Sequence, residues 1–296
     1  SSLAQGDLSL RERMHAAETL YAQGHYGMAA DLYAAVHGGQ DNYALRRRLQ
    51  ALNLADRRAE ARRLFETLPP AQRASDSYLP VGVAIYESAG LLKPALKLLE
   101  SALQQHDVLR NRLIWIQLLV RLSRSDEMRD WLDRVSEDIE GTPIELIALA
   151  QLVDRYLSNA TKALSLGYRA LRTGYGHPRI HLAYALGLIV GGRASSVTMA
   201  APQVIQAGAG VVLINDATGE ELHRIIEPGP APAVERDELS PDEPFAKRLL
   251  GLRVGDRIEF PKLGVGPQSY RVAEIQTPSL FAFRRTMRQF PTLFPD

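Results

Sequence analysis

The first two thirds of the chain repeat one pattern of small and large apolar residues. Ala29 is followed four positions later by Tyr33, and the same pair returns as Ala61 with Phe65. The small position recurs with a period of about 34 residues, in five copies. These positions are Ala29, Ala61, Ala95, Met128 and Ala163. Apolar residues three and four apart around each of them predict helices, so we expect five helix pairs and a closing helix over 178–190.

A small residue between two helices is a packing requirement, because helix backbones approach closely only where one facing position is nearly bare. Helix-start signals agree, since Thr142 offers a capping hydroxyl directly before Pro143. One pair cannot bury its own apolar face, so the pairs are expected to stack into a solenoid with a concave surface. An irregular helical bundle is the alternative that the pattern leaves open.

The period, the alanine and the large residue after it resemble the tetratricopeptide (TPR) repeat. The resemblance covers about residues 10–192. It is loose in the last two copies, where Met128 replaces the small residue and Gly167 replaces the large one.

In TPR arrays, certain positions of each first helix face a ligand groove. Carried over by register, the candidate groove residues are Arg46, Gln50, Asn53, Arg110, Gln117, Arg121 and Arg155. The same register adds Met14, Glu18, Tyr21 and Glu87. Arg presents a planar fork that suits carboxylates, and Gln or Asn can hold an extended backbone. We therefore hypothesise an acidic peptide or a chain-terminal carboxylate as ligand, with a solvated, unused polar face as the alternative.

Helical periodicity ends at residues 191–196, and short runs of β character follow. Strands are expected at 211–214, 221–226, 257–260 and 269–276, with one helix at 243–250. The predicted class is α+β, a helical solenoid followed by a small antiparallel sheet on a helix. The expected domains are 1–194 for the repeats, 195–206 for a linker, 207–277 for the sheet domain and 278–296 for an amphipathic tail.

Residues 239–256 read Leu-Ser-Pro-Asp-Glu-Pro-Phe-Ala-Lys-Arg-Leu-Leu-Gly-Leu-Arg-Val-Gly-Asp. This run resembles the signature of the C-terminal domain of the bacterial GreA/GreB transcript-cleavage factors, and the likeness extends over about 207–277. Gly251 stands where a helix must end in a left-handed residue. Glu243 and Phe245 depart from the family pattern, which has Ser and Leu there.

The resemblance implies an FKBP-like fold that docks beside the secondary channel of RNA polymerase. The docking edge that it implies comprises Asp242, Phe245, Lys247 and Arg248. Phe245, with Phe260 and Tyr270, is also interpreted as core. Gre factors carry their catalytic acidic residues on an N-terminal coiled coil. Helical repeats occupy that place here, so transcript cleavage is not expected.

Helical repeats joined to a Gre-type domain resemble a class of bacterial conflict-system (antiphage defence) proteins that also carry a PIN-type ribonuclease domain. The alternative function is therefore the regulatory part of a metal-dependent ribonuclease whose catalytic domain lies outside this chain. The tail is consistent with a lead-in to another domain. Its stripe of Phe281, Arg284, Met287 and Phe290 is equally consistent with a helix that packs on the sheet.

The composition mainly excludes some kinds of partner and metal site. With 296 residues and a net charge of +1, the chain offers no general attraction for nucleic acid or membranes. The absence of cysteine excludes thiolate metal sites and fits a cytoplasmic protein. His177 and His181 lie four apart but have no third ligand nearby. We therefore predict a non-catalytic protein-interaction scaffold without metal or cofactor.

Overall fold

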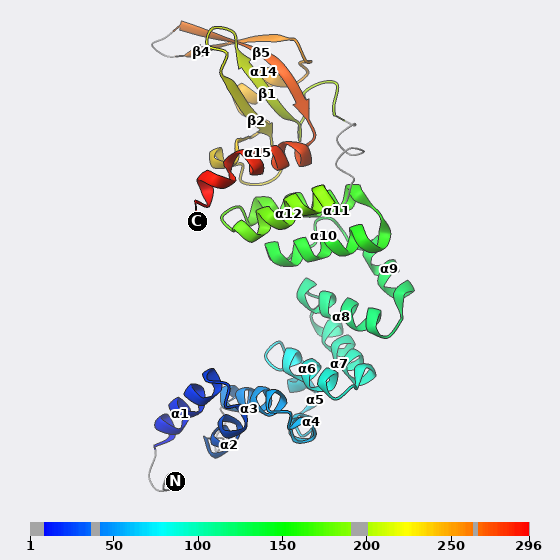
Figure 1. Ribbon diagram of the computed structural model, residues 1–296. Coiled ribbons are helices and arrows are strands. Elements are labelled where there is room, and N and C mark those ends of the chain that lie inside the picture. Colours follow the sequence, from blue (N-terminus) through cyan, green and yellow to red (C-terminus); the bar gives the residue numbers. More distant parts are fainter. Residues whose placement is uncertain (1–8, 37–41, 191–200, 263–265, 296) are drawn as a thin grey trace. The chain divides into compact units, whose positions relative to one another are not determined.

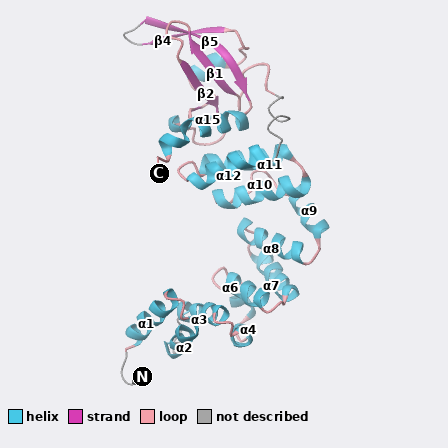
Figure 2. Ribbon diagram, in the orientation of Figure 1, coloured by secondary structure: helices cyan, strands magenta, loops and turns pink. Residues whose placement is uncertain are grey.

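The computed structural model describes residues 9–36, 42–190, 201–262 and 266–295 of the chain. It divides into two compact units, Ser1–Trp131 and Leu132–Asp296. Helices build the chain as far as α12, and the strands lie in the part that follows (Figures 1 and 2). Residues 195–200 of the expected linker lie outside the described residues. No described helix has both the length and the apolar character needed to cross a membrane.

The expected helix pairs are present. In the first unit the helices are α1 (Leu10–Ala22), α2 (Tyr26–Val36), α3 (Asn42–Leu54), α4 (Arg58–Glu66), α5 (Pro70–Arg73), α6 (Leu79–Ser88), α7 (Leu92–Gln105) and α8 (Leu109–Arg121), followed by α9 (Ser125–Arg134), which ends in the second unit. The second unit continues with α10 (Pro143–Leu157), α11 (Ala160–Thr173) and α12 (Pro178–Val190). The large residues of the first four copies, Tyr33, Phe65, Leu99 and Leu132, are all fully buried.

Close helix approach is clearest between α4 and α6. A Cβ atom on Gly82 would lie 2.2 Å from Cζ of Phe65, so only glycine lets this ring rest on the backbone of α6. The predicted start of α10 is also confirmed. The backbone N–H of Thr142 donates to Glu145 at 2.8 Å, and that of Glu145 donates to the Thr142 hydroxyl at 3.4 Å, a complete capping box.

A buried lysine closes the end of α9. The Lys162 ammonium, on α11, donates to the carbonyl oxygens of Leu132 at 2.9 Å and Asp133 at 2.7 Å. These carbonyls belong to the last turn of α9, where no intrahelical donor remains and a positive charge is favourable. Lys162 thus ties α11 to the last turn of α9.

The sheet has five strands in the order β3-β2-β1-β5-β4. They are β1 (Gly210–Asn215), β2 (Glu221–Ile226), β3 (Glu238–Leu239), β4 (Arg257–Lys262) and β5 (Gly266–Gln276). The four expected strands are confirmed and pair antiparallel. The sheet is nevertheless mixed, because β3 pairs parallel to β2. Two residues carry no alternating pattern, so this strand could not be predicted.

The predicted helix of the sheet domain is α14 (Pro244–Leu249), and Gly251 after it has the expected left-handed backbone, with φ of 86°. Its buried residues Ala246 and Leu249 join the hydrophobic core that the sheet provides. A 3-10 turn, η1 (Val234–Arg236), precedes β3.

The tail forms the helix α15 (Pro278–Leu293), which agrees with the interpretation of its stripe as one face of a packing helix. Phe281 is buried against the start of β1, where a Cβ atom on Gly210 would come within 2.6 Å of its ring. Phe290 contacts the ring of His181 on α12 at 6.3 Å between centroids. Phe281 and Phe290 of the stripe therefore pack on the sheet and on α12, whereas Met287 is 56% exposed.

Candidate protein-binding surfaces

A pocket opens in the first unit between α1, α3 and α6, which are the first helices of the first three pairs. Its volume is about 210 Å³. Its lining residues are Tyr21, Gln50, Asn53, Leu54, Pro80, Val81 and Ala84. Two predicted groove residues, Gln50 and Asn53, meet here with Tyr21, which the same register selected. Asn53 already accepts a hydrogen bond from Ser88 at 2.5 Å, which fixes the orientation of its amide.

A polar cluster centred on Glu18 stands beside this pocket. The Glu18 carboxylate pairs with Arg47 at 2.7 Å and accepts hydrogen bonds from the hydroxyls of Tyr33 at 2.6 Å and Tyr43 at 3.0 Å. The Arg47 guanidinium also lies over the Tyr21 ring, 4.1 Å from its centroid. The Arg47 hydrogen bond is the main reason that the pKa of Glu18 falls to about 2. The sequence register did not select Arg47.

The other predicted groove residues of the first unit differ in their surroundings. Arg121 forms an ion pair with Glu87, 34 residues earlier on the chain. Arg46 is half-buried and lies over the Tyr43 ring at 5.5 Å. Arg110 and Gln117 are exposed on α8. Glu87 therefore neutralises part of the positive charge of the predicted groove, since a paired guanidinium is less available to a ligand.

Arg155, the predicted groove residue of the second unit, is exposed at an open groove between α10 and α12. The groove measures about 710 Å³. It is lined by Gln151, Asp154, Arg155, Arg179, Leu182, Ala183, Leu186 and Gly187. Apolar and basic side chains therefore share this surface.

The predicted docking edge is split between core and surface. The Phe245 ring packs edge-on against Phe260 at 4.1 Å between centroids and borders the hydrophobic core of the sheet domain. Lys247 and Asp242 are exposed and 3.6 Å apart. Arg248, also exposed, donates to the Glu259 carbonyl at 2.9 Å. The exposed part of this edge thus consists of charged side chains held close to α14.

A buried ion cluster that the sequence did not reveal joins α11 to the sheet domain. Arg172 contacts Glu227 at 3.4 Å and Glu238 at 2.9 Å, and Glu238 also receives Arg236 at 2.9 Å. Tyr168 donates to Glu227 at 2.5 Å. Burial alone would raise the pKa of Glu238, but the hydrogen bonds from the two arginines outweigh it and lower the pKa.

The histidine pair does not converge on a site. His177 is exposed, whereas His181 is buried, and its two ring nitrogens contact Thr286 at 3.2 Å and the Tyr175 carbonyl at 2.7 Å. Burial lowers the pKa of His181. Within the described residues, no group of three or more His, Asp or Glu side chains is arranged to hold a metal ion.

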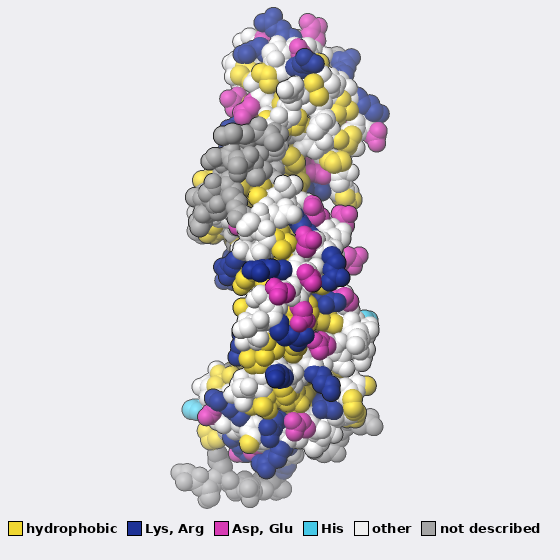
Figure 3. Space-filling model, turned by 90° about the vertical axis from the view of Figure 1, so that its right-hand side faces the viewer, with side chains coloured by type: hydrophobic (Ala, Val, Ile, Leu, Met, Phe, Trp, Pro, Cys, Tyr) yellow, Lys and Arg dark blue, Asp and Glu magenta, His cyan; other side chains and the backbone are white. Residues whose placement is uncertain are grey.

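Basic and acidic side chains intermingle on the face of the molecule in Figure 3. This mixture agrees with the net charge of +1 and with the ion pairs described above. Proteins that bind nucleic acid usually carry a large patch of positive charge. The surface seen in Figure 3 has no large patch of one charge sign.

No family model matches the chain, and no curated protein matches it. Among solved structures, it is similar to a thermophilic TPR protein of Thermus thermophilus, with 20% identity, a TM-score of 0.42, and coverage of 61% of this chain and 100% of the other. It is also similar to Gfh1 of Thermus aquaticus, with 22% identity, a TM-score of 0.24, and coverage of 56% of this chain and 90% of the other.

Proposed function

We propose that this chain is a non-catalytic protein-binding scaffold whose helical repeats hold a segment of a partner protein. The observation that supports it most directly is the pocket between α1, α3 and α6, where Gln50, Asn53 and Tyr21 meet at one opening. These side chains combine two amides, which can bind a peptide backbone, with an aromatic surface. Such a mixture is typical of protein-recognition sites.

The ion pairs limit which side chains of the repeats remain available to bind a partner. Arg47 and Arg121 already have carboxylate partners in Glu18 and Glu87, whereas Arg110 and Gln117 are exposed. A partner segment would thus be recognised mainly through backbone hydrogen bonds at Gln50 and Asn53. Acidic residues of the partner would add contacts with the exposed Arg110.

Substitution of both amides tests this function. Partner proteins captured by the wild type would be identified first, and their affinity measured for Gln50→Ala/Asn53→Ala. Loss of two hydrogen bonds is expected to weaken binding by about tenfold or more. The matched control is Gln104→Ala/Gln105→Ala, which removes two exposed amides from α7. Equal affinity of both double variants would contradict the proposal.

The finer part of the proposal concerns the sheet domain. The resemblance of residues 239–256 to Gre factors supports docking on RNA polymerase or a related surface. The exposed charges at α14, Lys247 and Arg248, would form the contact edge. Binding of core RNA polymerase to the full chain would be measured by sedimentation. Lys247→Glu should abolish it, while Lys93→Glu, an exposed lysine on α7, should leave it unchanged.

A further inference from the structure

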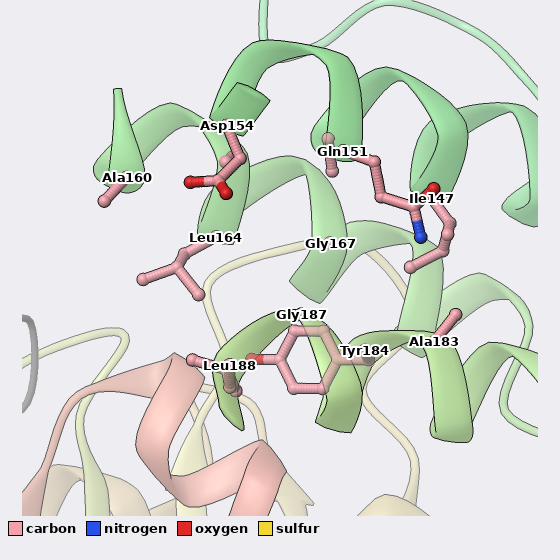
Figure 4. A pocket seen from close by; sticks show the side chains of 12 residues that line it. Ile147, Gln151, Asp154, Ala160, Leu164, Gly167, Ala183, Tyr184, Gly187 and Leu188 are labelled. Atoms are coloured by element: carbon pink, nitrogen blue, oxygen red, sulfur yellow. The ribbon is translucent and has the colours of Figure 1, made fainter. Parts of the chain in front are cut away.

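The fifth repeat contains an apolar cavity beside the glycine that replaces its large residue. In the first four copies this position carries Tyr33, Phe65, Leu99 and Leu132, all with 0% exposure. The fifth copy has Gly167, and a cavity of about 80 Å³ lies next to it between α10, α11 and α12 (Figure 4). Tyr184 of α12 reaches part of this space, 3.2 Å from where a Cβ atom on Gly167 would be. The missing side chain is thus only partly replaced.

The walls of the cavity favour an apolar guest. Ile147, Leu164 and Leu188 surround it together with several alanines, while Gln151 and Asp154 are its polar lining residues (Figure 4). The Tyr184 hydroxyl donates to the Ser279 carbonyl at 3.0 Å, so its hydrogen-bonding capacity is used within the protein. Covering apolar surface that faces water with an apolar group lowers the free energy.

The cavity opens into the groove between α10 and α12, since four residues line both. These shared residues are Gln151, Asp154, Ala183 and Gly187. On α12, Leu182 and Leu186 are 49% and 55% exposed and extend the apolar surface outward. Arg155 and Arg179 are exposed at the same groove. Apart from Arg179 and His181, α12 consists of apolar residues and one glycine, and a helix that is apolar nearly all round is normally covered.

We propose that this surface, here called the anchor groove, binds a protein segment that inserts one aliphatic side chain into the cavity and places acidic residues beside Arg155 and Arg179. The cavity alone, at about 80 Å³, has room for one side chain of a segment that lies along the groove, and it is smaller than small-molecule pockets of roughly 300–1,000 Å³. The two guanidinium groups complement carboxylates. The residues that line the open groove between α10 and α12 include no aromatic side chain on which a base could stack, which disfavours single-stranded nucleic acid. The inference rests on the proposed scaffold function and adds a second binding surface with its partner chemistry.

A random twelve-residue peptide library displayed on phage is the probe. It would be selected on the full chain, and the enriched peptides would be synthesised with a fluorophore and measured by fluorescence polarisation. Among the enriched peptides, we expect a class with one Leu, Ile or Met near Asp or Glu. Replacing that aliphatic residue by Ser is expected to weaken binding by about tenfold or more.

The decisive variant is Gly187→Leu, which places a side chain at the mouth of the cavity. A Cβ atom on Gly187 meets no heavy atom within 4 Å, so a side chain can start here without displacing a neighbour. It should weaken the peptides of this class by about tenfold or more, since the anchor loses its site. The control Gly27→Leu, at a helical glycine with equally open surroundings in the first unit, should leave affinity unchanged. Arg155→Gln/Arg179→Gln should weaken binding most at low salt.

Several outcomes would overturn the inference. Equal binding of all enriched peptides to the wild type and Gly187→Leu would do so, as would enriched peptides without an aliphatic anchor. A dimer that Gly187→Leu dissociates would also do so, because the occupant would then be a second copy. Peptides lost only on Gln50→Ala/Asn53→Ala would uphold the scaffold function while the anchor groove fails. A library without any binder would contradict both.

Discussion

Arg172 donates two hydrogen bonds, of 2.9 and 3.1 Å, to the carboxylate of Glu238. The first residue lies on α11, a repeat helix, and the second on β3, in the sheet domain. The Glu238 side chain has no exposed area, and that of Arg172 is 11% exposed. The pair therefore links a repeat helix to the sheet through a nearly dry contact, in which both charges depend on each other.

Removing the arginine should be costly. Arg172→Met leaves Glu238 and Glu227 buried with less compensation, and breaking such a pair typically costs about 3–5 kcal/mol. Calorimetric unfolding of the full chain would measure the loss. The matched control is Arg284→Met, whose pair with Glu274 is half exposed and should contribute less than about 1 kcal/mol. Equal effects would show that Arg172 is not specially placed.

The contact between α4 and α6 should tolerate no added methyl group. Gly82→Ala places a Cβ atom against the Phe65 ring, and overpacking of this kind costs about 1–3 kcal/mol. Gly27→Ala, on α2 with open space around it, should instead stabilise by about 0.5–1 kcal/mol through helix propensity. Urea denaturation compares the two. A neutral Gly82→Ala would contradict the close packing.

Phe245 should contribute to stability and not only to docking. Its ring packs against Phe260 at the border of the sheet core, so Phe245→Ala is expected to destabilise by about 3 kcal/mol. Lys247→Ala removes an exposed side chain and should change the free energy of unfolding by less than about 0.5 kcal/mol. Amide hydrogen exchange in residues 210–260 would separate the two. Unchanged exchange in Phe245→Ala would exclude a packing role.

Glu18 should make the unfolding free energy of the first unit depend on pH in the acidic range. Its pKa in the folded protein is about 2, mainly because of the Arg47 hydrogen bond, whereas an unfolded glutamate titrates near about 4.3. The stabilisation is therefore complete above about pH 5 and is lost as the pH falls toward 2. Wild type and Glu18→Gln should differ in unfolding free energy at neutral pH and converge in that window. A pH-independent difference would contradict the pairing.

The fold could largely be predicted because its signals are local. Ala29 is followed four residues later by Tyr33, and Ala61 by Phe65. This spacing reflects helix packing, in which a small residue lets two helices approach closely. Four strands could likewise be predicted from short runs of residues with β character. The short β3 did not, since its place is set by the parallel contact with β2 and by Arg172 on a distant helix.

The register predicted which side chains share one surface better than it predicted their ion pairs. The register brought Gln50 and Asn53 to one pocket. The pairing of Arg121 with Glu87 was not predicted, although their separation of 34 residues equals one repeat and places them on the first helices of neighbouring pairs. The cavity also had a sequence signal. Gly167 breaks the pattern of large residues, but only the structure shows that Tyr184 does not fill the space.

The burial of Lys162 has a practical use. Lysine occurs at only five positions in this arginine-rich chain, and the ammonium that caps α9 is withheld from solvent. An amine-reactive dye should therefore spare it while modifying the exposed Lys93, Lys97 and Lys247. The exposed lysines on α7 and α14 therefore serve as labelling controls. Labelling of Lys162 would report separation of α11 from the end of α9.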